Sequence, residues 1–125
     1  MSTHWNDSQP IYWQLKERTI AMILDGTLDE GDALPSVRTV ASEFQLNPIT
    51  VSKSYQALVD EGLVEKRRGV GMFVREGARK QLMDSEREKF IREEWPAMVS
   101  RIQQLGLDIE DLLKRAKNDN EDTST

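Results

Sequence analysis

The chain has 125 residues and a formal net charge of −5, with 31% charged and 38% hydrophobic residues. This length fits one domain, or one domain with a small accessory piece, and oligomerisation often completes a core of this size. The absence of cysteine excludes disulfides and thiolate catalysis and fits a reducing compartment, and the single His4 leaves no usual set of metal ligands.

The first predicted element is a helix that opens at Pro10 and stops at Gly26. A missing amide costs nothing in a first helical turn, and glycine is typical just beyond a helix end. Mainly apolar side chains recur on one face with a period of 3.6 residues: Ile11, Tyr12, Leu15, Thr19, Met22 and Ile23. We interpret this helix as a support that faces the core. Beyond it, Ala33-Leu34 are expected to form a short strand that pairs with a later hairpin.

A second, short helix is predicted to begin after Ser36, which is placed to cap it. Its buried stripe consists of Val37, Val40, Ala41 and Phe44. Arg38 and Thr39 then face outward near the helix N-terminus, where free amides and the helix dipole favour phosphate. Arg38 adds a planar, permanently charged group that suits phosphate or guanine. A surface salt bridge is the alternative role of Arg38.

A third helix is predicted after a tight turn at Gln45-Leu46, with Asn47 as its cap and Pro48 at its first position. The inward side chains are Val51, Tyr55, Leu58 and Val59, and the outward ones are Ile49, Thr50, Ser52, Lys53 and Gln56. The outward face thus combines short polar groups with one cation and one apolar side chain. This mixture suits base edges, a thymine methyl group and phosphates. An ordinary solvated helix face is the alternative.

Two short strands are predicted at residues 63–66 and 72–75, joined by a tip at residues 67–71 that contains two glycines. Glycine permits a positive φ and a close approach of the backbone to another surface. Lys66, Arg67 and Arg68 concentrate positive charge at this tip, and arginine is favoured in narrow minor grooves. Arg68 is the stronger candidate for DNA contact, since Arg67 can lie on the other face of the hairpin.

The charges are distributed unevenly along the chain. Residues 34–80 hold eight Lys or Arg against five Asp or Glu, whereas residues 81–125 hold seven against eleven. Because charges on a protein surface are screened beyond about 10 Å, an acidic protein can still bind DNA through one basic face. The positive excess coincides with the two short helices and the hairpin.

In this order, residues 10–75 resemble the DNA-binding domain of the GntR family of bacterial transcription regulators. The resemblance is carried most clearly by Pro10-Ile11-Tyr12, Leu34-Pro35-Ser36-Val37-Arg38, Asn47-Pro48, Thr50-Val51, Glu61-Gly62-Leu63 and Arg68-Gly69-Val70-Gly71. It implies a winged helix-turn-helix whose second helix, recognition helix and wing tip contact DNA. With the outward-facing Thr39 and Ile49 added, the predicted DNA-binding residues are Ser36, Arg38, Thr39, Asn47, Pro48, Ile49, Thr50, Ser52, Lys53, Arg68, Gly69 and Gly71.

One departure from the family concerns the bases that are read. Several members carry arginines in the recognition helix at positions where this chain has Pro48 and Ser52. The resemblance therefore implies the class of ligand, double-stranded DNA, but not the operator sequence. Substitutions at Thr50 and Lys53 are expected to change the base preference.

The segment after the wing is too short for a large effector domain. Ser85 and Glu88 have the spacing of a capping box, and the apolar residues that follow recur in steps of four and three, which is typical of a helix seam. Pro96 must kink this helix or begin a new one after Glu94. Gly106 is predicted to end the helix and Asp108 to cap a last one. Residues 118–125 are polar and expected to be disordered.

Two short amphipathic helices expose more apolar surface than they can cover. They can fold back onto the winged helix or pair with a second copy, and we favour pairing because a dimer matches a two-fold operator. The tail, including Gln104-Leu105-Gly106-Leu107-Asp108, resembles the YtrA-like branch of the family, which implies dimerisation through these helices and often control of transporter operons. The predicted dimerisation residues are Ile91, Trp95, Met98, Ile102, Leu105, Ile109, Leu112 and Leu113.

The sequence thus predicts a mostly α fold with a small β-wing, a winged helix-turn-helix followed by two C-terminal helices. Its expected parts are a DNA-binding domain at 8–76, a two-helix dimerisation region at 77–117 and a disordered tail at 118–125. We expect a cytoplasmic homodimeric repressor of a palindromic operator, without a cofactor, a metal or a membrane partner. A winged helix that binds a protein instead of DNA is the alternative. An enzyme is excluded because the chain lacks a nucleophile–base pair and a phosphate-cradling loop.

Overall fold

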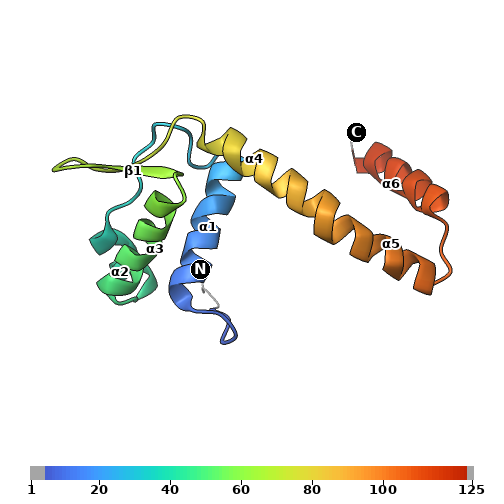
Figure 1. Ribbon diagram of the computed structural model, residues 1–125, viewed down its shortest axis with the longest axis horizontal. Helices are drawn as coiled ribbons and strands as arrows, with labels where there is room; N and C mark the ends of the chain where they lie inside the picture. Colours follow the sequence, from blue (N-terminus) through green and yellow to red (C-terminus); the bar gives the residue numbers. More distant parts are fainter. Residues whose placement is uncertain (1–4, 124–125) are drawn as a thin grey trace. The chain divides into compact units, whose positions relative to one another are not determined.

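The computed structural model describes residues 5–123, and the side chains of residues 5–120. The chain divides into two compact units, Met1–Asp84 and Ser85–Thr125. The predicted fold class is confirmed, because helices predominate and two antiparallel strands form a hairpin (Figure 1). His4, the single histidine of the chain, lies outside the described residues.

Three helices build the first unit: α1 (Ile11–Asp25), α2 (Val37–Phe44) and α3 (Pro48–Asp60). Helix α3 lies between α1 and α2 and packs against both (Figure 1). The caps and the turn of the helix-turn-helix form as the sequence predicts. Ser36 caps α2, Gln45 takes a left-handed φ of 55° in the turn, and Asn47 caps α3.

Most of the core of this unit comes from the predicted inward faces. The buried apolar side chains are Leu15, Ile20, Ile23, Leu34, Val40, Ala41, Val51, Tyr55, Leu58, Leu63, Val64, Val74, Ala78 and Leu82. Ile20 is buried although it lies off the predicted stripe of α1, whereas Ile11 at the start of that stripe is exposed. The inward face of α1 is therefore rotated from the predicted one, and it meets α3.

The hairpin consists of β1 (Val64–Arg67) and β2 (Gly71–Val74), with Val64 opposite Val74 and Arg67 opposite Gly71. Each strand is displaced by one residue from its predicted range. Leu63 is excluded from β1 because its amide donates to Leu58 O at 3.0 Å and so closes the end of α3.

The segment before α2 pairs with the outer side of β2. The amide of Leu34 donates to Met72 O at 2.8 Å, and Ala33 forms an isolated bridge with Phe73. The predicted pairing of Ala33-Leu34 with the wing is thereby confirmed, as a bridge and not as a full strand. It joins the start of the helix-turn-helix to β2.

Helix α4 (Ala78–Lys89) begins seven residues before the predicted capping box. Gly77, with φ of 88°, ends the preceding turn, and Ala78 and Leu82 are buried in the core of the first unit. Ser85 consequently lies inside a helix and caps nothing, so the capping-box prediction is wrong. The boundary between the two units falls after Asp84, whereas the sequence predicts a domain boundary after residue 76.

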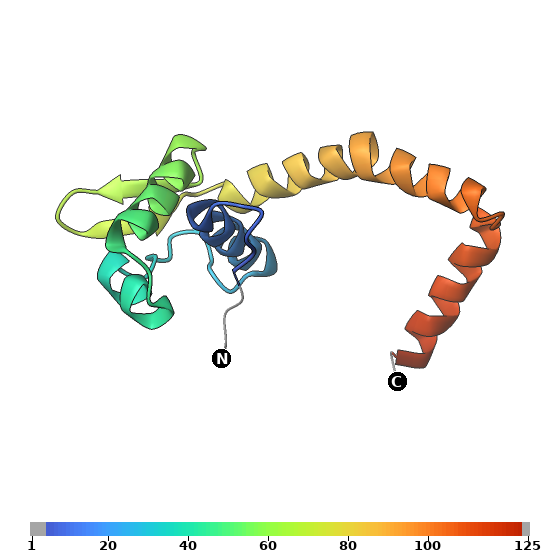
Figure 2. The same cartoon turned by 90° about the horizontal axis from the view of Figure 1, so that it is seen from below.

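The proline in the tail is accommodated by a π-helical turn. This turn, η1 (Phe90–Glu94), precedes α5 (Trp95–Gln104), and the amide of Trp95 donates to Phe90 O, five residues earlier (Figure 2). Pro96 lacks an amide and would clash with a carbonyl in a regular α-helix, and the wider turn relieves this conflict. A new helix thus begins after Glu94, one of the two predicted outcomes.

The last helix, α6 (Ile109–Thr123), starts as predicted but is longer than predicted. Gly106 has φ of 68°, and Asp108 Oδ1 accepts from the amide of Glu110 at 2.9 Å. The helix continues through the polar segment at 118–123, which the sequence predicts to be disordered, and residues 124–125 lie outside the described residues. No glycine or proline follows Gly106, and extending an existing helix costs far less than starting one.

Candidate nucleic-acid interface

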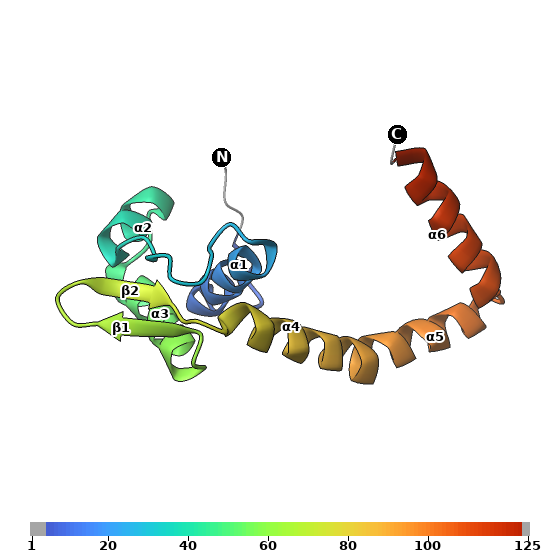
Figure 3. The same cartoon turned by 90° about the horizontal axis from the view of Figure 1, so that it is seen from above.

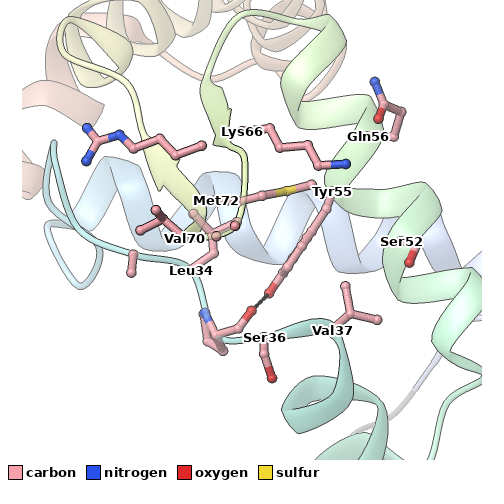
Figure 4. A pocket seen from close by; sticks show the side chains of 14 residues that line it. Leu34, Ser36, Val37, Ser52, Tyr55, Gln56, Lys66, Val70 and Met72 are labelled. Atoms are coloured by element: carbon pink, nitrogen blue, oxygen red, sulfur yellow. Dashed lines mark hydrogen bonds between the residues drawn. The ribbon is translucent and has the colours of Figure 1, made fainter.

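The start of α2, one side of α3 and the hairpin enclose a groove of about 510 Å³ in the first unit. Figure 4 shows Ser52, Tyr55 and Gln56 from α3 and Lys66 and Met72 from the hairpin around it. The loop between β1 and β2 projects past α2 and α3 (Figure 3). We call the surface formed by this groove and the adjoining exposed ends of α2 and α3 the winged face.

The N-terminus of α2 presents one unpaired cation. Ser36 Oγ accepts from the amide of Thr39 at 3.1 Å and lies 2.8 Å from Thr39 Oγ1, so both hydroxyls are engaged in capping. Arg38 is exposed, and it forms no ion pair with any side chain of residues 5–120. The salt bridge considered as its alternative role is therefore absent from the described part of the chain.

The first turns of α3 are exposed as the sequence predicts. Asn47 Oδ1 accepts from the amide of Ile49 at 2.9 Å, and the Ile49 side chain is 74% exposed. Ser52 lines the groove, whereas Thr50 is half-buried. Pro48 and Arg38 line a second, shallower hollow between the ends of α2 and α3.

Lys53 faces outward as predicted, and it contacts a ring on α1. Its ammonium is 4.2 Å from the centroid of the Tyr12 ring on α1, so it stands on the side of α3 away from the wing. The sequence shows that Lys53 faces outward but not that α1 supplies a partner, because that contact depends on how α1 crosses α3.

The floor of the groove contains a tyrosine that ties α3 to the segment before α2. Tyr55 Oη donates to Pro35 O at 2.7 Å (Figure 4). Burial raises the pKa of Tyr55 to about 12, because the phenolate is disfavoured away from water. Tyr55 is therefore a neutral hydrogen-bond donor at physiological pH and holds the groove in shape.

The two arginines of the wing have different environments. Arg67 Nη2 lies 2.8 Å from Glu65 Oε1, and its guanidinium stacks 4.1 Å from the centroid of the Phe73 ring. Arg68 is exposed and forms no ion pair with the side chains of residues 5–120. Arg68 is thus the arginine of the pair that is available for a ligand.

The turn at the tip depends on one glycine. The amide of Val70 donates to Arg67 O at 2.9 Å across a four-residue turn, and Gly69 at the third position has φ of 77°. A type II turn requires this positive φ, which glycine adopts without strain. The turn exposes Arg68 together with Val70, which is 71% exposed.

Sequence reasoning left Lys66 out of the predicted site. Side chains on a strand alternate between faces, so Lys66 lies on the same face as the buried Val64 and opposite Met72. Figure 4 shows its ammonium turned into the groove, toward Tyr55. The two-residue alternation of side chains along β1, counted from Val64, predicts this orientation of Lys66.

The predicted dimerisation residues of the second unit are mostly uncovered. Trp95, Met98 and Leu105 are 40%, 55% and 54% exposed, and Ile91 and Leu113 are also exposed. Ile102 is buried, and Ile109 and Leu112 are half-buried. A row of large apolar side chains along α5 is therefore left in contact with solvent in a single chain.

A helix-turn-helix followed by a hairpin with exposed basic side chains defines a winged-helix DNA-binding protein. The family model of bacterial regulatory proteins of the gntR family matches residues 11–74. The chain belongs to this family, and it is a DNA-binding transcription regulator and not an enzyme. Within residues 5–123, no helix is long and apolar enough to span a membrane.

Two relatives from Bacillus subtilis match beyond the winged helix. The HTH-type transcriptional regulator YhcF is 34% identical over 94% of this chain and 95% of its own length. The HTH-type transcriptional repressor YtrA is 35% identical over 84% of this chain and 80% of its own length. The crystal structure of a GntR-family regulator from Bacteroides thetaiotaomicron is 31% identical, covers 91% of this chain and 99% of its own, and has a TM-score of 0.71.

Proposed function

We propose that the chain is a homodimeric repressor that binds a palindromic operator through the winged face of each subunit. The observation that carries this proposal is the set of three exposed cations, Arg38, Lys66 and Arg68. They surround α3, and they form no ion pair with the side chains described, those of residues 5–120. Unpaired basic groups around an exposed helix form the electrostatic footprint of a DNA-binding surface. The similarity to the repressor YtrA supports repression.

The shape of the winged face is consistent with this mode of binding. A helix with its side chains is roughly 10–12 Å across and fits a major groove about 12 Å wide. With α3 in the major groove, the groove between α3 and β1 accepts the sugar–phosphate strand, where Lys66 meets a phosphate. The projecting tip then brings Arg68 to the neighbouring minor groove.

The dimer is proposed from the second unit. Large apolar side chains along α5, with Trp95 and Met98 among them, are exposed in the single chain, and a second copy would cover them. A two-fold dimer presents two winged faces to two half-sites about one helical turn of DNA apart.

We place this regulator in the cytoplasm, where its operator is. The resemblance to the YtrA-like branch makes transporter operons the first candidates for regulated genes. Any small effector is expected at the dimer interface.

The test is selection of bound duplexes from a random DNA library by the full-length protein. We expect an enriched palindrome whose half-sites are separated by about 10 base pairs, and binding that weakens steeply with salt. Enrichment of a single, non-repeated site would contradict the dimeric mode. Recovery of no sequence at all would contradict DNA binding by this surface.

A further inference from the structure

The recognition helix α3 carries one basic side chain, Lys53, and its position is set by another helix. The Lys53 ammonium lies 4.2 Å from the centroid of the Tyr12 ring, and Tyr12 belongs to the first turn of α1. Among the side chains of residues 5–120, neither has a second hydrogen-bond or ion-pair partner. The contact is therefore the one interaction of the described chain that orients this cation.

Lys53 and the wing lie on opposite flanks of α3. Ser52 and Gln56 line the groove beside the hairpin, whereas Lys53, which follows Ser52 in the sequence and lies about 100° around the helix from it, is turned toward α1. Ile49 is exposed between these flanks. A helix in a major groove has a phosphate strand on each side, so a cation on the α1 flank faces backbone and not base edges.

We propose that Tyr12 is a positioning residue for DNA binding. Its ring holds Lys53 on the α1 flank of α3, where the ammonium neutralises a phosphate of the strand opposite the wing. A free lysine side chain loses much rotamer entropy when it is fixed, and the ring lowers this loss by restricting Lys53 beforehand. This inference rests on the proposed function, and it changes the role predicted for Lys53 from base preference to backbone binding.

The experiment is a double-mutant cycle on the full-length protein, measured by fluorescence anisotropy with the selected operator over a range of salt concentrations. Tyr12→Leu should weaken binding by about two- to fivefold, the size of an exposed cation–π contact. Lys53→Ala should weaken binding to all operator variants by a similar factor and lower the slope of log K against log salt by about 0.9. In the Lys53→Ala background, Tyr12→Leu should have no further effect. Tyr12→Phe keeps the ring and should bind like the wild type.

Several outcomes would overturn the proposal. Equal losses from Tyr12→Leu in both backgrounds would mean that Tyr12 acts without Lys53, and a loss with Tyr12→Phe would mean that the hydroxyl itself contacts DNA. A changed base preference in Lys53→Ala would contradict the phosphate role. If the wild type selects an operator and the cycle is additive, the positioning role alone fails; if the wild type selects none, the proposed function fails.

A measurement on the free wild-type protein keeps the contact testable even if Tyr12→Leu folds poorly. The ring current of Tyr12 should shift the Lys53 Hε resonances upfield relative to those of the other lysines. Unshifted resonances would overturn the contact.

Discussion

At the scale of single residues, the two adjacent arginines of the wing should behave differently. Arg67 is held by Glu65 and stacked on Phe73, whereas Arg68 has no ion-pair partner among the side chains of residues 5–120. Arg68→Ala should weaken operator binding by about 1 kcal/mol or more and lower the salt slope, because a DNA contact is removed. Arg67→Ala is the matched control, and its effect on affinity should be small. Equal losses in an anisotropy titration would contradict this assignment.

Ser54 provides a test of stability that does not involve DNA. This residue is fully buried in α3, and its hydroxyl has no hydrogen-bond partner among the described residues. Ser54→Ala should raise the free energy of unfolding by roughly 1 kcal/mol, because an unpaired buried hydroxyl is costly and alanine favours helix. Ser52→Ala, on the exposed side of the same helix, should gain less. A lower urea midpoint for Ser54→Ala would contradict the prediction.

Tyr55 predicts a dependence of stability on alkaline pH. Its pKa is raised from about 10 in the unfolded chain to about 12 by burial, so the neutral form stabilises the fold. This contribution is complete below pH 10 and is lost as the pH rises toward 12. Tyr55→Phe should be less stable than wild type near pH 7 by roughly 1 kcal/mol, because Pro35 O loses its donor.

The difference between wild type and Tyr55→Phe should narrow between pH 10 and 12, because only the wild type loses this contribution. Urea unfolding of both proteins across this range measures it, and the deprotonation of lysines affects both alike. A constant difference would mean that the hydroxyl titrates normally.

At the scale of elements, the sequence predicts those that are determined locally. Ser36 and Asn47 cap α2 and α3 because their side chains accept from amides three and two residues away. The apolar period predicts most of the buried side chains, although the inward face of α1 is rotated from the predicted one. The start of α4 was not predicted, because it is determined by tertiary contacts and not by local sequence. Burial of Ala78 and Leu82 depends on side chains far away in the sequence, and it outweighed the local spacing of Ser85 and Glu88.

The candidate site was predictable to a similar extent. Arg38 and Arg68 follow from residue type and from positions on predicted elements. The two-residue alternation of the strand could have predicted that Lys66 faces the groove, but Lys66 is absent from the predicted DNA-binding residues. The partners of Lys53 and Arg67, Tyr12 and Phe73, follow only from how α1 crosses α3 and from the register of the hairpin. Residue chemistry thus predicts the candidate DNA-binding surface, while tertiary contacts determine which of its cations have a partner within the chain.

At the scale of the whole molecule, the proposed dimer can be tested on α5. Met98 is 55% exposed, so Met98→Glu should leave the single chain folded while placing a charge in the proposed interface. We expect light scattering to show a monomer for Met98→Glu and a dimer for Ser100→Glu, an exposed residue on the opposite side of the same helix. Ile102 is buried, so a charge there would disturb folding as well as association. A Met98→Glu protein that stays dimeric would contradict this interface.

The bridge between the segment before α2 and the wing has a consequence for operator spacing. The amide of Leu34 donates to Met72 O, and Tyr55 Oη donates to Pro35 O, so the segment before α2 is tied both to β2 and to α3. The amides of these linked elements should exchange with deuterium together, as one cooperative block. The distance between Arg38 and Arg68 is then constant, and it sets the spacing of the DNA contacts that these two residues make. A base pair inserted between the major-groove and minor-groove contacts of one half-site should abolish recognition, whereas the same insertion outside them should leave that half-site readable.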